Sequence, residues 1–77
     1  MDRLDIQYSL RKAGYRQVDI ARKLKLSKTT VGDIIAGRQR SQRIAREISS
    51  ILRRPVAEIW PGQYPDLERE QSRRRAA

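Results

Sequence analysis

The sequence of 77 residues contains no cysteine, no histidine and no phenylalanine. Without cysteine the chain can form neither a disulfide nor a thiolate metal site, so helix packing must hold this small fold together. Without histidine, and with nine carboxylates that form no HExxH or DxDxDG pattern, it lacks the usual metal and general acid–base arrangements. We therefore expect no catalytic residue, no metal site and no cofactor.

Long apolar runs are also missing. The longest have two or three residues, far short of the roughly 20 that a membrane-spanning helix needs, and no apolar stretch near Met1 resembles a signal peptide. We therefore expect a cytoplasmic protein. Acidic residues are scarce as well, because 18 Lys and Arg outnumber nine Asp and Glu and give a net charge of +9. This charge favours a polyanionic partner, either nucleic acid or anionic lipid.

Apolar residues recur at the helical period of about 3.6 residues in four segments. The stripes are Ile6, Leu10 and Ala13; Ile20, Ala21 and Leu24; Val31, Ile34 and Ile35; and Ile44, Ile48, Ile51 and Leu52. Gly14 and Gly37 suit helix ends, whereas Ser27 and Ser41 suit N-caps, because a serine hydroxyl can accept a hydrogen bond from an unpaired N–H of the first turn. Residues 38–43, RQRSQR, form a basic connection between the third and fourth helices.

The segment after the fourth helix is less regular. Pro55 fits a first helical position, so PVAEIW can form one more turn, closed by Pro61. From about Gln63 the charges alternate and few residues can join a core, which predicts a disordered tail. The prediction is an all-α domain of four to five helices over residues 1–62, followed by a flexible tail over residues 63–77.

The break at SKTT, within residues 17–37, is best explained as the turn between two helices. Counted from Gln17, small and apolar residues occupy the fifth, eighth, tenth, fifteenth and eighteenth positions, namely Ala21, Leu24, Leu26, Val31 and Ile34. This spacing resembles the helix-turn-helix of the lambda-repressor and Cro family, here over about residues 17–36. Lys25 departs from the family, which usually has a left-handed glycine there; lysine can adopt that conformation at a cost of about 1 kcal/mol.

A further resemblance covers most of the chain. The compact Ner-type regulators of Mu-like phages also run from a short first helix through this motif to an ending like IWPGQY, here Ile59 to Tyr64. The resemblance implies a DNA-binding transcriptional repressor that occludes a phage early promoter. We expect two copies to act on one site, as a homodimer or by pairing on DNA, because one recognition helix makes too few base contacts.

The exposed arc of the third helix carries short side chains that suit a major groove. We expect base contacts from Lys28, Thr29, Gly32 and Asp33. Lys28 could donate to guanine and Thr29 could touch a thymine methyl group, while Gly32 would let the backbone come close to DNA. Asp33 could accept from cytosine or pair with a nearby arginine, and the sequence favours neither.

A second set of residues suits phosphate binding, because it is basic or lies at a helix N-terminus. The expected phosphate contacts are Gln17, Ser27, Thr30, Arg38, Arg40 and Arg43, with Arg16, Arg22 and Lys23 as weaker candidates. The arginines at 73–75 could add nonspecific affinity only. Trp60, with Val56 and Ile59, is expected to close the core, the alternative being a dimer contact.

Other functions remain open on the sequence. The chain could be an accessory to transposition or recombination, or the DNA-binding part of an antitoxin. A basic RNA-binding or membrane-surface protein is less consistent with the sequence. RNA binding would favour more aromatic residues, and membrane binding would favour one long amphipathic basic helix.

Overall fold

Six helices make up the computed structural model, which describes residues 1–76, with side chains over residues 1–73. The helices are α1 (Arg3–Lys12), α2 (Gln17–Leu24), α3 (Lys28–Ile35), α4 (Gln42–Leu52), α5 (Val56–Ile59) and α6 (Pro65–Ala76). No strand occurs within residues 1–76, so the predicted all-α fold is confirmed. None of these helices has the length and apolar character required to cross a membrane.

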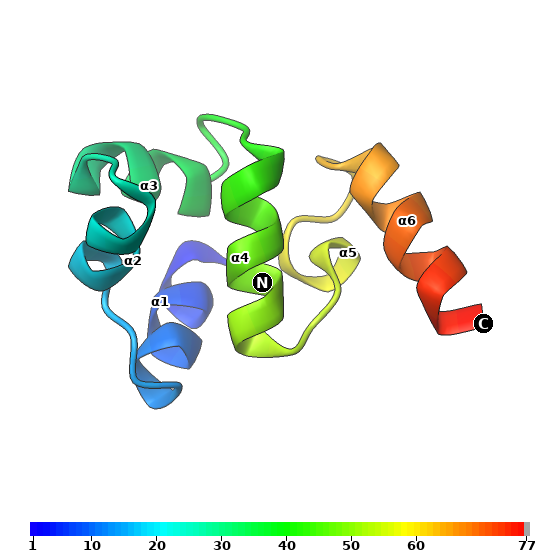
Figure 1. Ribbon diagram of the computed structural model, residues 1–77, viewed down its shortest axis with the longest axis horizontal. Helices are drawn as coiled ribbons and strands as arrows, with labels where there is room; N and C mark the ends of the chain where they lie inside the picture. Colours follow the sequence, from blue (N-terminus) through cyan, green and yellow to red (C-terminus); the bar gives the residue numbers. More distant parts are fainter. Residues whose placement is uncertain (77) are drawn as a thin grey trace.

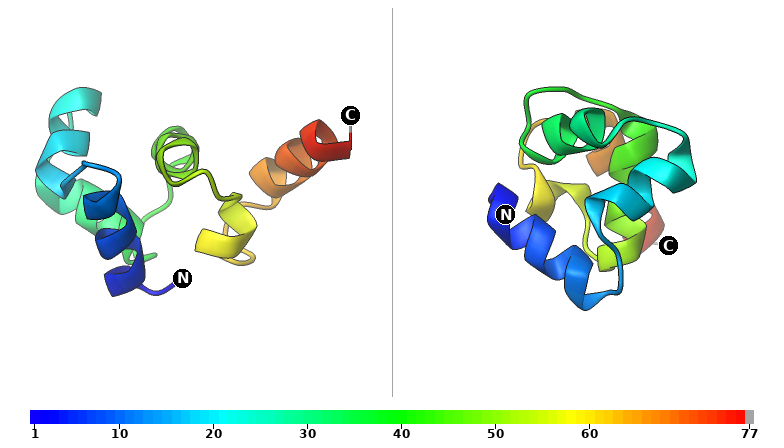
Figure 2. Two further views of the ribbon diagram at one scale, coloured as in Figure 1. Left: turned by 90° about the horizontal axis from the view of Figure 1, so that it is seen from below. Right: turned by 90° about the vertical axis from the view of Figure 1, so that its left-hand side faces the viewer.

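Helix α4 occupies the middle of the molecule. Figure 1 and the left view of Figure 2 show α1, α2 and α3 on one side of α4, with α5 and α6 on the other. Helices α1, α3 and α5 all pack against α4, and α2 packs against α3. The part of the chain that carries the expected DNA contacts is therefore braced from behind by α4.

Local chemistry explains where α3 and α4 begin. The Ser27 hydroxyl accepts a hydrogen bond from the Thr30 N–H at 3.1 Å, and the Ser41 hydroxyl accepts one from the Ile44 N–H at 3.4 Å. Both predicted N-caps are confirmed. Because α4 starts at Gln42, the basic connection is shorter than the predicted residues 38–43, and Arg43 belongs to the first turn of a helix.

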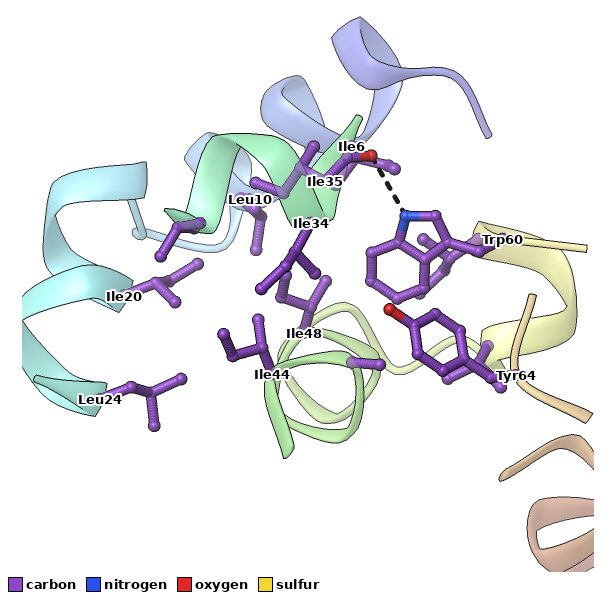
Figure 3. Packing of buried hydrophobic residues seen from close by; sticks show 14 of the residues in the cluster. Ile6, Leu10, Ile20, Leu24, Ile34, Ile35, Ile44, Ile48, Trp60 and Tyr64 are labelled. Carbon is purple, nitrogen blue, oxygen red and sulfur yellow. Dashed lines mark hydrogen bonds between the residues drawn. The ribbon is translucent and has the colours of Figure 1, made fainter. Parts of the chain in front are cut away.

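The core is formed by the predicted apolar stripes. Ile6, Ile20, Val31, Ile34 and Ile48 are all buried, and Figure 3 shows most of them converging between α1, α2, α3 and α4. Ala13 is an exception: it is the C-cap of α1 and is exposed, because the helix ends before that position can turn toward the core.

Trp60 closes the core from the α5 side, as the sequence predicted. Its side chain is only 3% exposed, and its indole Nε1–H donates to the Ile35 carbonyl oxygen at 3.2 Å (Figure 3). The Tyr64 ring meets it edge to face, with ring centroids 5.6 Å apart. The Tyr64 hydroxyl oxygen in turn accepts a hydrogen bond from the Ser41 N–H at 3.1 Å. This aromatic pair therefore joins the end of α3 and the start of α4 to α5.

The predicted disordered tail is wrong over the described residues, because α6 occupies Pro65–Ala76; Ala77 lies outside them. Leu67 is buried, and Gln71 bonds to two other helices. Its Oε1 accepts from the Val56 N–H at 2.9 Å, and its Nε2 donates to the Ser49 hydroxyl at 3.1 Å. Sequence periodicity missed this helix because one apolar side chain, one amide and the ion pair of Glu70 with Arg46 of α4 anchor it, rather than a stripe.

Lys25 confirms the left-handed turn between α2 and α3, with φ 58° and ψ 47°. The Leu26 N–H donates to the Ala21 carbonyl at 2.8 Å, which closes the end of α2. Replacing Lys25 with glycine should raise the free energy of unfolding by about 1 kcal/mol and Tm by about 4–8 °C, because glycine lacks the Cβ that opposes this conformation.

Thermal melts followed by circular dichroism would test this prediction. Lys25→Ala is the matched control, because it removes the same charge and keeps a Cβ, so it should give none of the gain. Equal stabilisation by Lys25→Gly and Lys25→Ala would assign the effect to charge instead of backbone conformation.

Candidate nucleic-acid interface

The first turn of α3 presents Lys28 and Thr29 to solvent. Ser27 and Thr30 lie beside them, and their hydroxyl oxygens are 2.8 Å apart. One hydroxyl donates to the other, and the Ser27 oxygen also accepts the Thr30 N–H, so this pair orders the start of the helix. A well-capped first turn holds the Lys28 and Thr29 backbones rigidly, and only their side chains remain free to adapt.

Gln17 begins α2, and its side chain lies between α1 and α3. Its Oε1 accepts a hydrogen bond from Gln7 Nε2 of α1 at 2.6 Å. Its Nε2 lies 3.0 Å from the position that a Cβ on Gly32 would occupy. Gly32 therefore makes room for the Gln17 amide, a reason for glycine that the sequence alone did not show.

Asp33 pairs with Arg38 across the end of α3. The Asp33 Oδ1 accepts from Arg38 Nη2 at 2.8 Å and from Nε at 3.0 Å. The Asp33 carbonyl also accepts the backbone N–H groups of Arg38 and Gln39, at 2.8 and 3.2 Å. Of the two roles that the sequence left open for Asp33, the structure shows pairing with arginine. Each charge of the pair is partly neutralised by the other.

Arg40 and Arg43 have different surroundings. Arg40 lies in the exposed connection after α3, and its side chain has no hydrogen-bond or ion-pair partner within the part of the chain that the structure describes. Arg43 lies on α4, where its Nη2 donates to the Leu24 carbonyl at 3.4 Å, at the end of α2. A cation at this end of a helix stabilises the unpaired carbonyl groups there. The sequence assigned both arginines to phosphate contacts, but Arg43 is bonded to the end of α2, whereas Arg40 is unpaired within the described part of the chain.

The weaker candidates Arg16 and Lys23 both contact acids. The Asp19 carboxylate accepts the Arg16 backbone N–H at 2.8 Å, which lowers the Asp19 pKa, and the Arg16 side chain adds an ion pair at 3.4 Å. Lys23 Nζ lies 2.5 Å from Glu47 Oε1 of α4, and this hydrogen bond raises the Lys23 pKa. Lys23 therefore braces α2 against α4, whereas Arg16 stays at the exposed start of α2.

A pocket of about 310 Å³ opens where α1 ends and α2 begins. It is lined by Gln7, Leu10, Arg11, Tyr15, Arg16, Gln17, Val18 and Lys28, a set with three cations and no acid. The Arg16 N–H bonds to the Asp19 carboxylate, and the Asp19 and Ile20 N–H groups bond to the Arg16 carbonyl. The N–H groups of Gln17 and Val18 remain as backbone donors for this wall, because the first N–H groups of a helix have no partner four residues earlier within it. Cationic side chains, amides and a helix N-terminus together suit a phosphate group.

Sequence reasoning missed Gln7 and Arg11 of this pocket, because it assigned α1 only a packing role. The available signal for Gln7 was its position directly after Ile6 of the apolar stripe. Its contact with Gln17 depends on how α1 packs against α2, which spacing along the chain does not reveal.

The packing of α2 against α3 across the left-handed turn at Lys25 defines a helix-turn-helix. A family model described as winged helix-turn-helix DNA-binding matches residues 1–76, and the chain belongs to this family. It is thus a DNA-binding protein. Residues 1–76 include no strand that could form a wing, so this part of the chain shows only the helical portion of that description. Searches of curated proteins and of solved structures found no match.

Proposed function

We propose that this chain is a sequence-specific regulator that binds double-stranded DNA with α3 in the major groove. One observation carries the proposal: exposed Lys28 belongs both to the first turn of α3 and to the cationic pocket at the start of α2. A phosphate held in that pocket would position the same turn of α3 beside the base edges. Phosphate contacts position a protein on the duplex, whereas base contacts specify the sequence.

Lys28 and Thr29 are the base-reading residues of this proposal. The Lys28 ammonium would donate to guanine O6 or N7, and the Thr29 methyl group would contact a thymine methyl group. Asp33 acts differently, because it is engaged with Arg38 and holds that arginine at the end of α3. Gly32 would contribute by leaving the Gln17 amide its place.

Phosphate binding is divided between two places. At the start of α2, Arg11, Arg16 and Gln17 would hold one phosphate, helped by the backbone N–H groups there. In the Ser27–Thr30 pair only one of the two hydroxyl protons is used. The second hydroxyl can therefore donate to a phosphate of the same DNA strand. Arg40 would hold a phosphate beyond the other end of α3.

The regulatory role is repression of a phage or prophage early promoter by a Ner-type, lambda-repressor-like protein. Its support is the resemblance in the helix-turn-helix spacing and in the IWPGQY ending, whose Trp60 and Tyr64 form part of the core. Two copies would bind half-sites about one helical turn apart, because a single short recognition helix selects too few base pairs.

Selection of binders from a random pool of duplexes would test the proposal, since it reports both specificity and half-site spacing. Enrichment of one sequence with paired half-sites would support it. Recovery of no preferred duplex, together with tight binding to single-stranded RNA or to anionic liposomes, would overturn it. Occupancy of the enriched site within a promoter, with loss of transcription in vitro, would separate a repressor from a recombination accessory.

Binding to the selected duplex should weaken steeply with salt. Each neutralised phosphate contributes about −0.9 to the slope of log affinity against log salt. Three phosphate-binding arginines, Arg11, Arg16 and Arg40, predict a slope near about −2.7 per copy, or about a 40-fold loss between about 50 and 200 mM salt. Fluorescence anisotropy across this range would measure it, and a flat response would contradict the phosphate contacts.

Gly32→Ala should change fold stability and DNA affinity in opposite directions. Alanine is about 1 kcal/mol better than glycine inside a helix, so the free energy of unfolding should rise by up to that amount. The new Cβ would displace the Gln17 amide, the one group within 4 Å of it apart from its own chain neighbours and the adjoining backbone of α3, and DNA binding should weaken. Thermal melts and anisotropy titrations measure the two effects.

The Gln17→Ala background supplies the control for this experiment. If Gly32 acts by making room for Gln17, Gly32→Ala should lower affinity only when Gln17 is present. A similar loss in both backgrounds would instead mean that the α3 backbone itself approaches DNA at Gly32.

A further inference from the structure

We propose that Gln7 of α1 is a positioning residue for DNA binding, which aims the Gln17 side-chain amide nitrogen at a phosphate. This inference rests on the proposed function, because it requires a phosphate at the start of α2. It adds to that phosphate site a residue of α1 that does not itself contact DNA.

The direction of one hydrogen bond carries the argument. Gln7 Nε2 donates to Gln17 Oε1 at 2.6 Å, so the carbonyl end of the Gln17 amide is occupied. The other end, an NH₂ group with two protons, is left to face outward from this contact. A phosphate oxygen only accepts hydrogen bonds, so this orientation presents the matching end of the amide. The reverse orientation would turn an oxygen toward the phosphate and repel it.

Gly32 leaves room for that nitrogen on the opposite side. Gln17 Nε2 lies 3.0 Å from the place of a Cβ on Gly32, so the nitrogen rests against the α3 backbone. The Gln17 side chain is thus held at its carbonyl by Gln7 of α1, and its nitrogen lies beside Gly32 of α3. It spans the junction of the three helices that form this side of the molecule.

The surroundings have the polarity that an anion requires. Gln7 and Gln17 both line the 310 Å³ pocket, and the charged residues around them are Arg11, Arg16 and Lys28. Arg16 also pairs with Asp19, yet its side chain remains 70% exposed and can reach a second anion. In this pocket the neutral Gln17 amide contributes a directed hydrogen bond, whereas the arginines and Lys28 contribute charge.

Fixing the amide before DNA arrives should strengthen binding. A free glutamine side chain loses rotamer freedom when it is immobilised, and a group that is already ordered avoids this loss on binding. Since Gln7 orders Gln17 without touching DNA, its removal should weaken binding by about three- to tenfold, close to the effect of removing Gln17 itself.

A double-mutant cycle on the selected duplex tests the proposal, with Gln7→Met, Gln17→Ala and the double variant titrated by anisotropy. Methionine keeps the length and volume of Gln7 and removes the donor. We expect Gln7→Met to lower affinity in the wild-type background and to have no further effect in the Gln17→Ala background. The salt slope should stay unchanged in all three variants, because neither glutamine is charged, whereas Arg16→Ala should reduce it.

Gln7→Glu supplies a second variant that keeps a hydrogen bond to Gln17. A carboxylate can only accept, so the Gln17 amide should turn and present its oxygen to the phosphate. The loss should exceed that of Gln7→Met when Gln17 is present, and the Gln17→Ala background measures the part due to the added charge alone.

The outcomes separate this inference from the proposed function. Failure of the wild-type protein to bind any duplex would contradict both the proposed function and this inference. If the wild type binds, equal effects of Gln7→Met in both backgrounds would show that Gln7 acts independently of Gln17 and would overturn the inference alone. So would unchanged binding by both Gln7 variants, with their folding verified by circular dichroism.

Discussion

Trp60→Ala is expected to lower the free energy of unfolding by about 3–5 kcal/mol, the usual range for removing a buried tryptophan. The indole is 3% exposed, meets Tyr64 edge to face and donates to the Ile35 carbonyl at the end of α3. Small domains are stable by only about 5–15 kcal/mol, so this one change should leave much of the protein unfolded at 37 °C. Urea denaturation followed by circular dichroism measures the loss.

Two milder variants divide this effect. Trp60→Phe keeps an aromatic ring and removes the donor to Ile35, while Tyr64→Phe removes the acceptor for the Ser41 N–H. Each leaves one backbone group without its partner and should cost about 1–3 kcal/mol. A loss below about 1 kcal/mol for Trp60→Ala would mean that α5 is not part of the cooperative fold, and would reopen the dimer contact as the role of this residue.

Replacing Lys28 or Thr29 with alanine should each cost about 1–3 kcal/mol of binding free energy on the selected duplex and much less on random duplex. Both side chains are exposed on the first turn of α3, so the loss should come from base contacts and not from the fold. Thr29 gives the cleaner test because it carries no charge. Competition titrations with selected and random duplexes measure the ratio of the two affinities.

Arg40→Ala is the matched comparison for those variants. Because Arg40 is proposed to hold a phosphate, its loss should weaken selected and random duplexes alike and reduce the salt slope by about 0.9. Arg38→Ala is a poorer control, since it also leaves Asp33 unpaired. Discrimination that survives both Lys28→Ala and Thr29→Ala, in folded protein, would mean that another face of α3 meets DNA.

Features determined by neighbours along the chain were predictable from sequence. The stripe in α3, the serine caps and the left-handed turn each depend on a few adjacent residues, and the structure confirms them. The spacing from Ala21 to Ile34 worked because a helix-turn-helix is itself a short local motif.

Features that depend on tertiary packing were not predictable. The Gln7–Gln17 bond requires the angle between α1 and α2, and Arg43 reaches Leu24 only because α4 lies against the end of α2. The sequence analysis gave pairing with an arginine as one of two roles for Asp33. Deciding between them required the course of the chain after α3, which brings Arg38 to Asp33. Helix α6 escaped prediction because its anchoring by Leu67 and Gln71 leaves no periodic pattern.

The way α6 is attached also bears on how the molecule opens. Leu67 is its one buried apolar side chain over the described residues, and Gln71 supplies its hydrogen bonds to Val56 and Ser49. Detaching α6 exposes far less apolar surface than separating α2 from α3, so this end of the chain forms a unit of lower local stability. Amide protons of α6 would then exchange with solvent through a partial opening that leaves the helix-turn-helix intact. The free energy of local opening is thus lower for the C-terminal helix than for the helix-turn-helix, although both belong to one small domain.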